Sequence, residues 1–334
     1  MSNPRLAIGA YRYDNMRALF DGSVTIDGVD ADLSTAKIAS DIFKRMIRER
    51  EFDVSELGWT YYLRTLDFND PPFIALPVFP NRQFRHSAIY INTSGGITQP
   101  QDLAGKNIGE FAIYGHDPGV WQKGILSDEY GVTPEQCRWV IGGLDWPMAP
   151  IDFIPFLHPS DVDVTRAPEG KELGQMLDDG EIDALISADV PQCILADSPR
   201  VARLFPDYER VERDYFERTG IYPAMHTVVA RKELADERPE LIRNVYEAFC
   251  DSKDAAGELY RNRRIFNNMD QCMVPWFSRL LDENRRFFPE NWFPYGVEAN
   301  RAMVDTFLRY HYEQGLSKHR LTCEDVFVPE LLDT

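Results

Sequence analysis

The sequence predicts an α/β protein of two lobes, joined by two hinge crossings and completed by a helical C-terminal region. Short apolar runs alternate with amphipathic stretches through the first two thirds of the 334 residues, which is the pattern of α/β proteins. Proline-containing segments at 77–86 and 222–226 interrupt this alternation, so the backbone is expected to cross between the lobes there. Helical periodicity dominates after residue 239.

The first lobe is predicted to begin with buried strands and one amphipathic helix. Ser40 or Asp41 is suited to cap this helix, which is expected to run to residue 48. The apolar segment 73–78 then leads into the first crossing. Strands are expected at 6–10, 31–34 and 52–56.

The second lobe is predicted to repeat the alternation from residue 88 onward. Gly131 ends a helix over 120–130, and the segment 146–168 is interpreted as a long loop, either a lid or a cover for apolar surface. Further elements are expected as strands at 107–109, 137–141 and 182–187 and as a helix at 173–178.

Helices expected at 239–261, 276–288 and 299–314 are predicted to rejoin the first lobe. That lobe then comprises residues 1–86 and 226–334, and the second lobe comprises residues 87–225. Two lobes with two crossings form a cleft at the hinge, which is a common location for a small-molecule site.

Composition excludes several classes of function. The formal net charge of −18 argues against nucleic-acid or anionic-membrane binding, which needs a basic surface. No apolar run approaches the roughly 20 residues that cross a bilayer, and the N-terminus lacks the features of a secretory signal. Scattered cysteines without disulfide or metal spacing fit reduced thiols and a cytoplasmic location; they are Cys137, Cys193, Cys250, Cys272 and Cys323.

The two crossings carry the main candidate catalytic residues. Residues 79–86 (FPNRQFRH) place Arg82, Arg85 and His86 at the first crossing, and His226 holds the equivalent place at the second. Guanidinium groups suit carboxylates, and imidazole transfers protons near neutral pH. The alternatives are a structural role for each histidine and an exposed salt bridge for each arginine. The pattern favours a site for an anionic substrate that requires acid–base chemistry.

Three residues near predicted strand ends are further candidates for substrate binding. Glu56 ends a predicted strand, where α/β sheets place ligand-binding groups, although it is also suited to cap a following helix. Tyr11 and Arg12 follow the first strand and hold a similar position.

Residues around the predicted helix at 120–130 complete the candidate set. His116 is a candidate to meet the substrate in the second lobe, or to cap the helix with its neighbour Asp117, for which capping is the expected role. Trp121 is a candidate wall for an aromatic ring, or else a core residue.

Cofactor dependence is not expected. His86, His226 and Glu56 have the ligand types of a divalent-metal site, but no close-spaced ligand motif supports one, so metal-free chemistry is predicted. The phosphate-binding GxGxxG and P-loop motifs and the GxSxG elbow are absent, which argues against nucleotide-dependent and serine-hydrolase functions.

Several motifs along the chain resemble one known family. They include residues 13–20 (YDNMRALF), 74–86 (IALPVFPNRQFRH), 219–228 (TGIYPAMHTV) and 294–300 (PYGVEAN). The sequence resembles the 4,5-dihydroxyphthalate decarboxylases, which are cytoplasmic relatives of the two-lobed (type II) periplasmic binding proteins. The resemblance implies a homo-oligomeric enzyme that converts 4,5-dihydroxyphthalate to protocatechuate without an organic cofactor.

Such a reaction gives the candidate residues roles. His86 and His226 are predicted to share the proton transfers at the phenol and at the ring carbon, each contributing about 10²–10⁴-fold in rate. Arg82 and Arg85 are predicted to hold the carboxylates, with one of them in direct contact. The alternative function is a cytoplasmic solute-binding or sensor protein for an aromatic carboxylate, which needs the arginines but has no use for two proton carriers.

Overall fold

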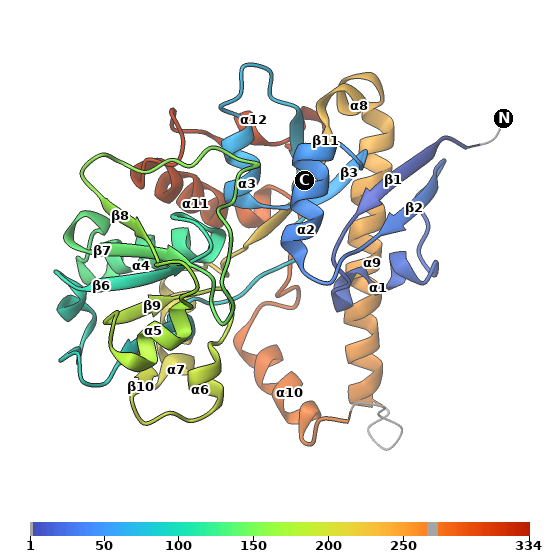
Figure 1. The fold of residues 1–334 in the computed structure, drawn as a ribbon. Coiled ribbons are helices and arrows are strands. Elements are labelled where there is room, and N and C mark those ends of the chain that lie inside the picture. The colour runs from blue at the N-terminus through green and yellow to red at the C-terminus, as the bar shows by residue number, and fades with distance from the viewer. Residues whose placement is uncertain (1–2, 266–272) are drawn as a thin grey trace.

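The computed structural model describes residues 3–265 and 273–334, and these form two α/β lobes with a helical C-terminal region (Figure 1). Cys272, one of the cysteines expected to be reduced, lies outside the described residues. The first sheet has the strand order β2-β1-β3-β11-β4, and the second has the order β10-β5-β9-β6-β7-β8. The predicted fold class is therefore confirmed.

The first sheet is mixed. Strand β1 pairs in parallel with β2 and β3, whereas β11, which returns from the second crossing, is antiparallel to β3 and β4. Every residue of β3 is buried because this strand lies at the centre of the sheet. The strands are β1 (Arg5–Gly9), β2 (Asp30–Ser34), β3 (Val54–Gly58), β4 (Phe73–Leu76) and β11 (His226–Arg231).

The second sheet is parallel at β9, β6, β7 and β8 and antiparallel at β5 and β10. The polar strand β8 lies within the segment predicted as a loop, and β10 is only three residues long, so neither gave a clear apolar pattern. The strands are β5 (Ile89–Asn92), β6 (Asn107–Phe111), β7 (Arg138–Gly142), β8 (Asp163–Arg166), β9 (Ala184–Ile186) and β10 (Val201–Arg203).

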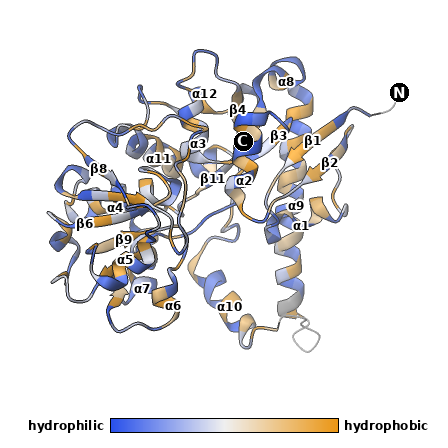
Figure 2. Ribbon diagram, in the orientation of Figure 1, coloured by the Kyte–Doolittle hydropathy of each residue, from blue (hydrophilic) through white to orange (hydrophobic). Residues whose placement is uncertain are grey.

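Helices cover both sheets. Strands contribute many of the buried apolar residues, whereas α10 alternates between hydrophilic and hydrophobic residues along its length (Figure 2). The helices are α1 (Arg17–Phe20), α2 (Ala39–Lys44), α3 (Trp59–Thr65), α4 (Asp117–Tyr130), α5 (Leu173–Asp179), α6 (Gln192–Leu195), α7 (Tyr208–Thr219), α8 (Lys232–Glu237), α9 (Pro239–Ile265), α10 (Phe277–Phe287), α11 (Arg301–Glu313) and α12 (Cys323–Val326). No helix in the described ranges combines the length and apolar character that crossing a bilayer requires.

The two crossings between the sheets pair with each other. Arg82 and Ala224 form an antiparallel bridge, the N–H of Gln83 donates to the carbonyl of Pro223 at 3.0 Å, and the N–H of Met225 donates to the carbonyl of Asn81 at 2.8 Å. The prolines prevent these segments from joining a longer sheet, and the hydrogen bonds between the two crossings satisfy backbone groups that would otherwise lack partners. The paired segment ends at Met225, and the next residue, His226, is the first residue of β11.

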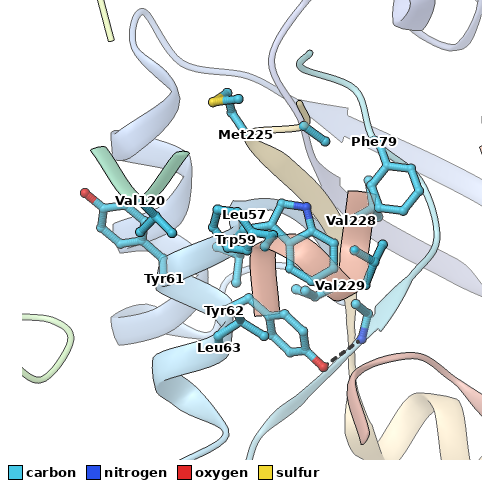
Figure 3. Close-up of a cluster of buried hydrophobic side chains, with 14 of the residues drawn as sticks. Leu57, Trp59, Tyr61, Tyr62, Leu63, Phe79, Val120, Met225, Val228 and Val229 are labelled. Atoms are coloured by element: carbon cyan, nitrogen blue, oxygen red, sulfur yellow. Dashed lines mark hydrogen bonds between the residues drawn. The ribbon is translucent and has the colours of Figure 1, made fainter. Parts of the chain in front are cut away.

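A cluster of buried aromatic and aliphatic side chains supports this junction (Figure 3). The Trp59 ring stacks on Phe79 at a centroid distance of 6.0 Å. Tyr62 fixes two segments at once, because its hydroxyl donates to the carbonyl of Val326 at 2.5 Å and accepts from the N–H of Ala75 at 3.2 Å. The junction is therefore a packed core.

Helix α11 contacts both lobes. Its ring of Phe307 packs on Trp121 of α4, while Nε2 of His311 lies 3.1 Å from the hydroxyl of Thr60 in α3. Helices α8 and α9 contact the first lobe. The sequence placed all of residues 226–334 with the first lobe, but α11 bridges the two.

The loop over residues 146–162 also reaches across to the first lobe (Figure 1). Arg48 forms an ion pair of 2.7 Å with Asp152, and the carbonyl of Pro155 accepts a hydrogen bond of 2.8 Å from buried Arg64. The segment interpreted as a lid or a surface cover thus connects the second lobe to α3 and to the π-helical turn Arg45–Glu49 that follows α2.

Close packing between α4 and α11 makes a testable prediction about stability. A Cβ at Gly124 would lie 2.1 Å from the Tyr310 ring, whereas a Cβ at Gly257, also within a helix, meets nothing within 4 Å. Gly124→Ala is expected to lose about 1–3 kcal/mol by overpacking, and Gly257→Ala to gain up to about 1 kcal/mol. Denaturant unfolding of both variants measures this difference, and equal effects would contradict the packing.

Candidate active site

A buried carboxylate holds His226 at the start of β11. Glu56 lies in the adjacent strand β3, two residues before Gly58, which pairs with His226, and its Oε1 is 2.6 Å from Nδ1 of His226. The same carboxylate accepts the hydroxyl of Tyr13 at 2.8 Å and the N–H of Tyr11 at 2.7 Å. Glu56 is fully buried, so these three contacts replace its hydration. Glu56 makes its hydrogen bonds with Tyr11, Tyr13 and His226. These contacts do not support the alternative role of capping a following helix.

The other ring nitrogen of His226 has no hydrogen bond within the described part of the chain, and 11% of the side chain is exposed. The ring packs edge-on against Phe43 at 5.1 Å, and the hydroxyl of Tyr13 lies 3.2 Å from Nδ1. With Nδ1 engaged, Nε2 is the atom available to a substrate. Burial and the nearby Glu56 charge raise the pKa of Tyr13, so this hydroxyl stays protonated.

Asp117 connects the second lobe to this cluster. Its Oδ1 accepts the N–H of Thr60 at 2.6 Å, so it caps the first turn of α3 in the other lobe. The sequence predicted that Asp117 caps its own helix, and this was wrong because α3 begins directly opposite. A Cβ at Gly58, the β-sheet partner of His226, would lie 2.3 Å from Oδ2. Burial raises the pKa of Asp117 to about 6, against the opposing charge of His226.

His116, next to Asp117, forms a second histidine–carboxylate pair. Its Nδ1 lies 3.1 Å from Oε1 of Glu110, which also receives Lys123 at 2.6 Å. Its Nε2 is buried and has no hydrogen-bond partner in the described ranges. Sequence reasoning named His116 but missed Glu110 and Lys123. Glu110 is the one charged residue of β6, but Lys123 shares α4 with three acidic residues, so its position in the sequence did not distinguish it.

The guanidinium of Arg82 is bound by protein oxygens at both terminal nitrogens, while its buried Nε has no partner among the described residues. Its Nη1 donates to the carbonyl of Tyr222 at 2.8 Å, and its Nη2 donates to the carbonyl of Pro294 at 2.8 Å and to Asn300. The group also stacks on Phe79. These contacts favour a structural role for Arg82, because protein oxygens already occupy both terminal nitrogens, and its substrate contact stays a prediction.

Arg85 keeps a terminal nitrogen available. Its Nε donates to the carbonyl of Phe84 at 2.9 Å and its Nη2 to Gln83, while Nη1 makes no hydrogen bond to a described residue. Burial lowers its pKa to about 10, so the group stays cationic at neutral pH. The charge of Arg85 also helps to lower the pKa of His116, which places the two groups within electrostatic range.

His86 lies in a different environment from His226. Its ring packs edge-on against Phe205 at 5.3 Å and Tyr215 at 5.4 Å, and Nδ1 is buried without a partner among the described residues. Burial, assisted by the charge of Arg218, lowers its pKa to about 4. The two rings share no hydrogen bond or ring contact within the described ranges, so the predicted His86–His226 pair is not supported by the contacts of either ring.

The remaining candidates have mostly supporting positions. Tyr11 contributes its N–H to Glu56, and its ring packs on Tyr13 at 5.1 Å. Arg12 is exposed and its guanidinium lies 4.9 Å from the Phe20 ring centre. Trp121 is fully buried and donates from its indole nitrogen to the carbonyl of Ala224 at 2.9 Å. Its core alternative describes these contacts better than a wall for substrate.

No group of three or more His, Cys, Asp or Glu side chains in the described ranges is arranged to hold a metal ion. The set His86, His226 and Glu56 considered as ligands is not gathered into such a group. Metal-free chemistry stays a prediction.

A cavity of about 760 Å³ lies between α9, α10 and the turn that follows Tyr13. Asp14 and Asn15 line it on one side, and Phe293, which contacts Arg82, lines it on another. It adjoins the candidate site without including His226 or His116.

The two lobes, their paired crossings and the hinge-side histidines define a protein with the periplasmic-binding-protein fold. Solved structures with this fold include the alkanesulfonate-binding protein SsuA of Xanthomonas axonopodis pv. citri, at a TM-score of 0.52 and 10% identity, covering 97% of each chain. The aliphatic sulphonate binding protein SsuA of Escherichia coli has a TM-score of 0.54 and 11% identity, covering 99% of each chain. These likenesses concern the fold alone. A scan against models of protein families finds no match.

Curated relatives are more specific. The 4,5-dihydroxyphthalate decarboxylase of Comamonas testosteroni is 36% identical over 334 residues, covering 100% of this chain and 99% of that protein. The protein of the same name from Pseudomonas putida is 35% identical over 216 residues, covering 65% of this chain and 83% of that protein. The chain belongs to the 4,5-dihydroxyphthalate decarboxylase family, as the motifs indicated.

The environment of His86 predicts acid sensitivity. Between pH 6.5 and about 4 the unfolded chain binds a proton at His86 that the folded chain excludes, so stability falls as pH falls through this window, by roughly 3 kcal/mol at the low end. His86→Phe fits an apolar surrounding and is expected to flatten part of this pH dependence. Urea unfolding of the wild type and of His86→Phe at pH 4.5 and 7.5 measures the effect. If both proteins lose the same free energy of unfolding between these two pH values, the burial of a neutral imidazole is contradicted.

Proposed function

We propose that this chain is a carboxy-lyase for a hydroxylated aromatic carboxylate, with 4,5-dihydroxyphthalate converted to protocatechuate as the leading reaction. Membership in a family whose curated relatives carry that name supports the reaction class. The observation that carries the proposal is His226, held through Nδ1 by buried Glu56 with Nε2 left for a substrate.

The reaction needs proton transfer at two positions of the substrate. Direct loss of carbon dioxide would leave an aryl carbanion, which is very unfavourable. Deprotonation of a hydroxyl para to the carboxylate instead moves electron density into the ring, so that the carboxyl-bearing carbon accepts a proton. Carbon dioxide then leaves as aromaticity returns. Proton carriers and a cation for the carboxylate are therefore the required groups.

His226 supplies one of these proton carriers. A buried carboxylate that binds Nδ1 fixes the ring orientation and stabilises the imidazolium form, as the aspartate does in serine-protease triads. Glu56 has this position and is itself fixed by Tyr13 and the backbone of Tyr11. Orientation of this kind is worth most when the substrate is held in one pose.

Arg85 is the proposed carboxylate ligand. It is cationic and buried, and its Nη1 is uncommitted among the described residues, so a substrate carboxylate would replace lost hydration at this nitrogen. Arg82 instead fixes the segment that carries Arg85. Only one of the two arginines then contacts the substrate.

Binding without catalysis is the alternative function, for a solute-binding or sensor protein. Such a protein would use Arg85 to bind the carboxylate but would not need the proton transfer that the Glu56–His226 pair provides. A cytoplasmic location and a homo-oligomeric state stay predictions from the resemblance, and cell fractionation and light scattering test them.

A turnover assay tests the proposed function. Wild-type protein with 4,5-dihydroxyphthalate is expected to release protocatechuate and carbon dioxide at a rate that a chelator does not change. His226→Gln is expected to lower kcat by about 10²–10⁴-fold, because Nε2 no longer exchanges protons, whereas His86→Phe is expected to retain turnover. Chromatography of the product measures both. Tight binding without product in the wild type would favour the alternative.

The two arginines are expected to separate binding from stability. Arg85→Met removes the proposed carboxylate ligand and is expected to raise KM at least tenfold with a smaller effect on kcat. Arg82→Met leaves three protein acceptors without their donor and is expected to lower the free energy of unfolding by about 2–4 kcal/mol. Steady-state kinetics and urea unfolding of both variants measure this contrast. The reverse pattern would exchange the two roles.

A further inference from the structure

The second lobe buries an ion pair that the proposed function does not yet use. Lys123 of α4 lies 2.6 Å from both carboxylate oxygens of Glu110 in β6, and the two side chains are 1% and 0% exposed. The ammonium group also lies over the Tyr114 ring at 4.1 Å. Burying such a pair costs more than burying apolar residues of the same volume. The ion pair contacts His116 directly, because Oε1 of Glu110 binds both Lys123 and Nδ1 of His116.

The ion pair determines which nitrogen of His116 carries the proton. Burial alone would raise the pKa of Glu110, but Lys123 and His116 outweigh burial and lower it. An ionised carboxylate only accepts hydrogen bonds. The Nδ1–H of His116, 3.1 Å from Oε1, therefore donates a hydrogen bond to Glu110 and keeps its proton. This leaves the lone pair on Nε2, which is buried and unpartnered among the described residues.

Electrostatics keeps this imidazole neutral. Burial lowers the pKa of His116 against the pull of Glu110, and the charges of Lys123 and Arg85 lower it further. Lys123 itself has its pKa lowered to about 8 by burial, so it is still cationic at neutral pH. The groups that act on this imidazole are therefore two cations, Lys123 and Arg85, and one carboxylate, Glu110, whose negative charge is balanced by Lys123.

His226 has the opposite surroundings. The titratable groups in contact with it or acting on its charge are Glu56, Tyr13 and Asp117, and no lysine or arginine contacts its ring in the described ranges. Asp117 follows His116 in sequence and lies against Gly58, the β-sheet partner of His226. Asp117 is therefore next to His116 in the chain and within electrostatic range of His226 in the other lobe.

We propose that His116 is the general base of the reaction and that Glu110 and Lys123 are positioning residues that hold it neutral with the proton on Nδ1. His226, beside Glu56, is then the general acid. The assignment rests on the proposed function. It replaces the predicted His86–His226 pair by a His116–His226 pair, and it sorts the two roles by the charges around each ring.

The proton and electron balance of the step closes. Nε2 of His116 takes the phenol proton, and the oxygen electron pair moves through the ring to the carboxyl-bearing carbon, which takes the proton of imidazolium His226. The carbon–carboxylate bond then breaks, its electron pair restores the aromatic ring, and carbon dioxide leaves. His116 returns its proton to the ring oxygen, and His226 regains one from water. The net change consumes one proton per carboxylate lost.

Nitrogen-15 spectroscopy of histidine-labelled protein tests the positioning claim without depending on turnover. In the wild type the His116 signals are expected to show Nδ1 protonated and Nε2 unprotonated at pH 7, and Nε2 is expected to shift when protocatechuate is added. In the isosteric variant Glu110→Gln the signals are expected to show a mixture of the two tautomers. Assignment by His116→Gln identifies the resonance. A wild-type ring protonated at Nε2, or one that ignores protocatechuate, would overturn the proposal.

Kinetics test the catalytic claim. Glu110→Gln and the double variant Glu110→Gln/Lys123→Met, which removes both charges together, are expected to lower kcat by about 10–100-fold with KM changed less than threefold, in line with the loss of a supporting carboxylate. Both are expected to shift the acidic limb of the pH–kcat profile, because protonation of the base His116 stops the reaction there. Thermal unfolding is recorded for each variant.

An exposed pair in the same lobe provides the matched control. Lys171 and Glu181 also lie 2.6 Å apart, but their side chains are 43% and 38% exposed, so Glu181→Gln and Lys171→Met are expected to leave kcat and the pH profile unchanged. Folded Glu110→Gln protein with wild-type kcat would overturn the inference. A wild type that binds 4,5-dihydroxyphthalate but releases no protocatechuate would instead overturn the proposed function, whatever the tautomer of His116.

Discussion

The structure depends on the backbone pairing between the two crossings. Residues 81–83 and 223–225 bind each other, and the second segment continues without a break into β11. Because β11 then pairs with β3, its first residue, His226, lies opposite Gly58 and within reach of Glu56. The same crossings carry Arg82 and Arg85. A change in this pairing would therefore move His226, the proposed proton carrier, and Arg85, the proposed carboxylate ligand, together.

Each lobe uses the same construction at this junction, with one difference. A strand supplies a buried glutamate and a neighbouring segment supplies a histidine bound through Nδ1, as Glu56–His226 in the first lobe and Glu110–His116 in the second. Only the second pair includes a lysine. Lys123 balances the negative charge of Glu110, so the two imidazoles have different electrostatic surroundings although their hydrogen-bond geometry is alike. Such a difference in surrounding charge is what lets one histidine act as an acid and another as a base at the same pH.

The sequence predicted the fold class and the crossings because each leaves a local signal, in apolar periodicity or in proline positions, and a specific motif singled out His226 as a candidate. It could not predict the surroundings of His86, since a histidine at a crossing looks alike in sequence whether its ring faces substrate or packs between Phe205 and Tyr215. It missed Glu110 and Lys123, which are 13 residues apart and ordinary in isolation. Their significance arises only when α4 packs on the second sheet, and no local pattern reports that contact.

The burial of these charges bears on the choice between enzyme and binding protein. A protein that only captures an aromatic acid needs a cation, for which Arg85 is the proposed residue, and a complementary surface. Two histidine–carboxylate pairs and a buried lysine reduce stability relative to an apolar core, because each charge loses its hydration. Such an arrangement is understandable where Nε2 of each ring must hold or release a proton at a fixed position. The cost of burying Glu56, Glu110 and Lys123 therefore argues for chemistry at this junction rather than for binding alone.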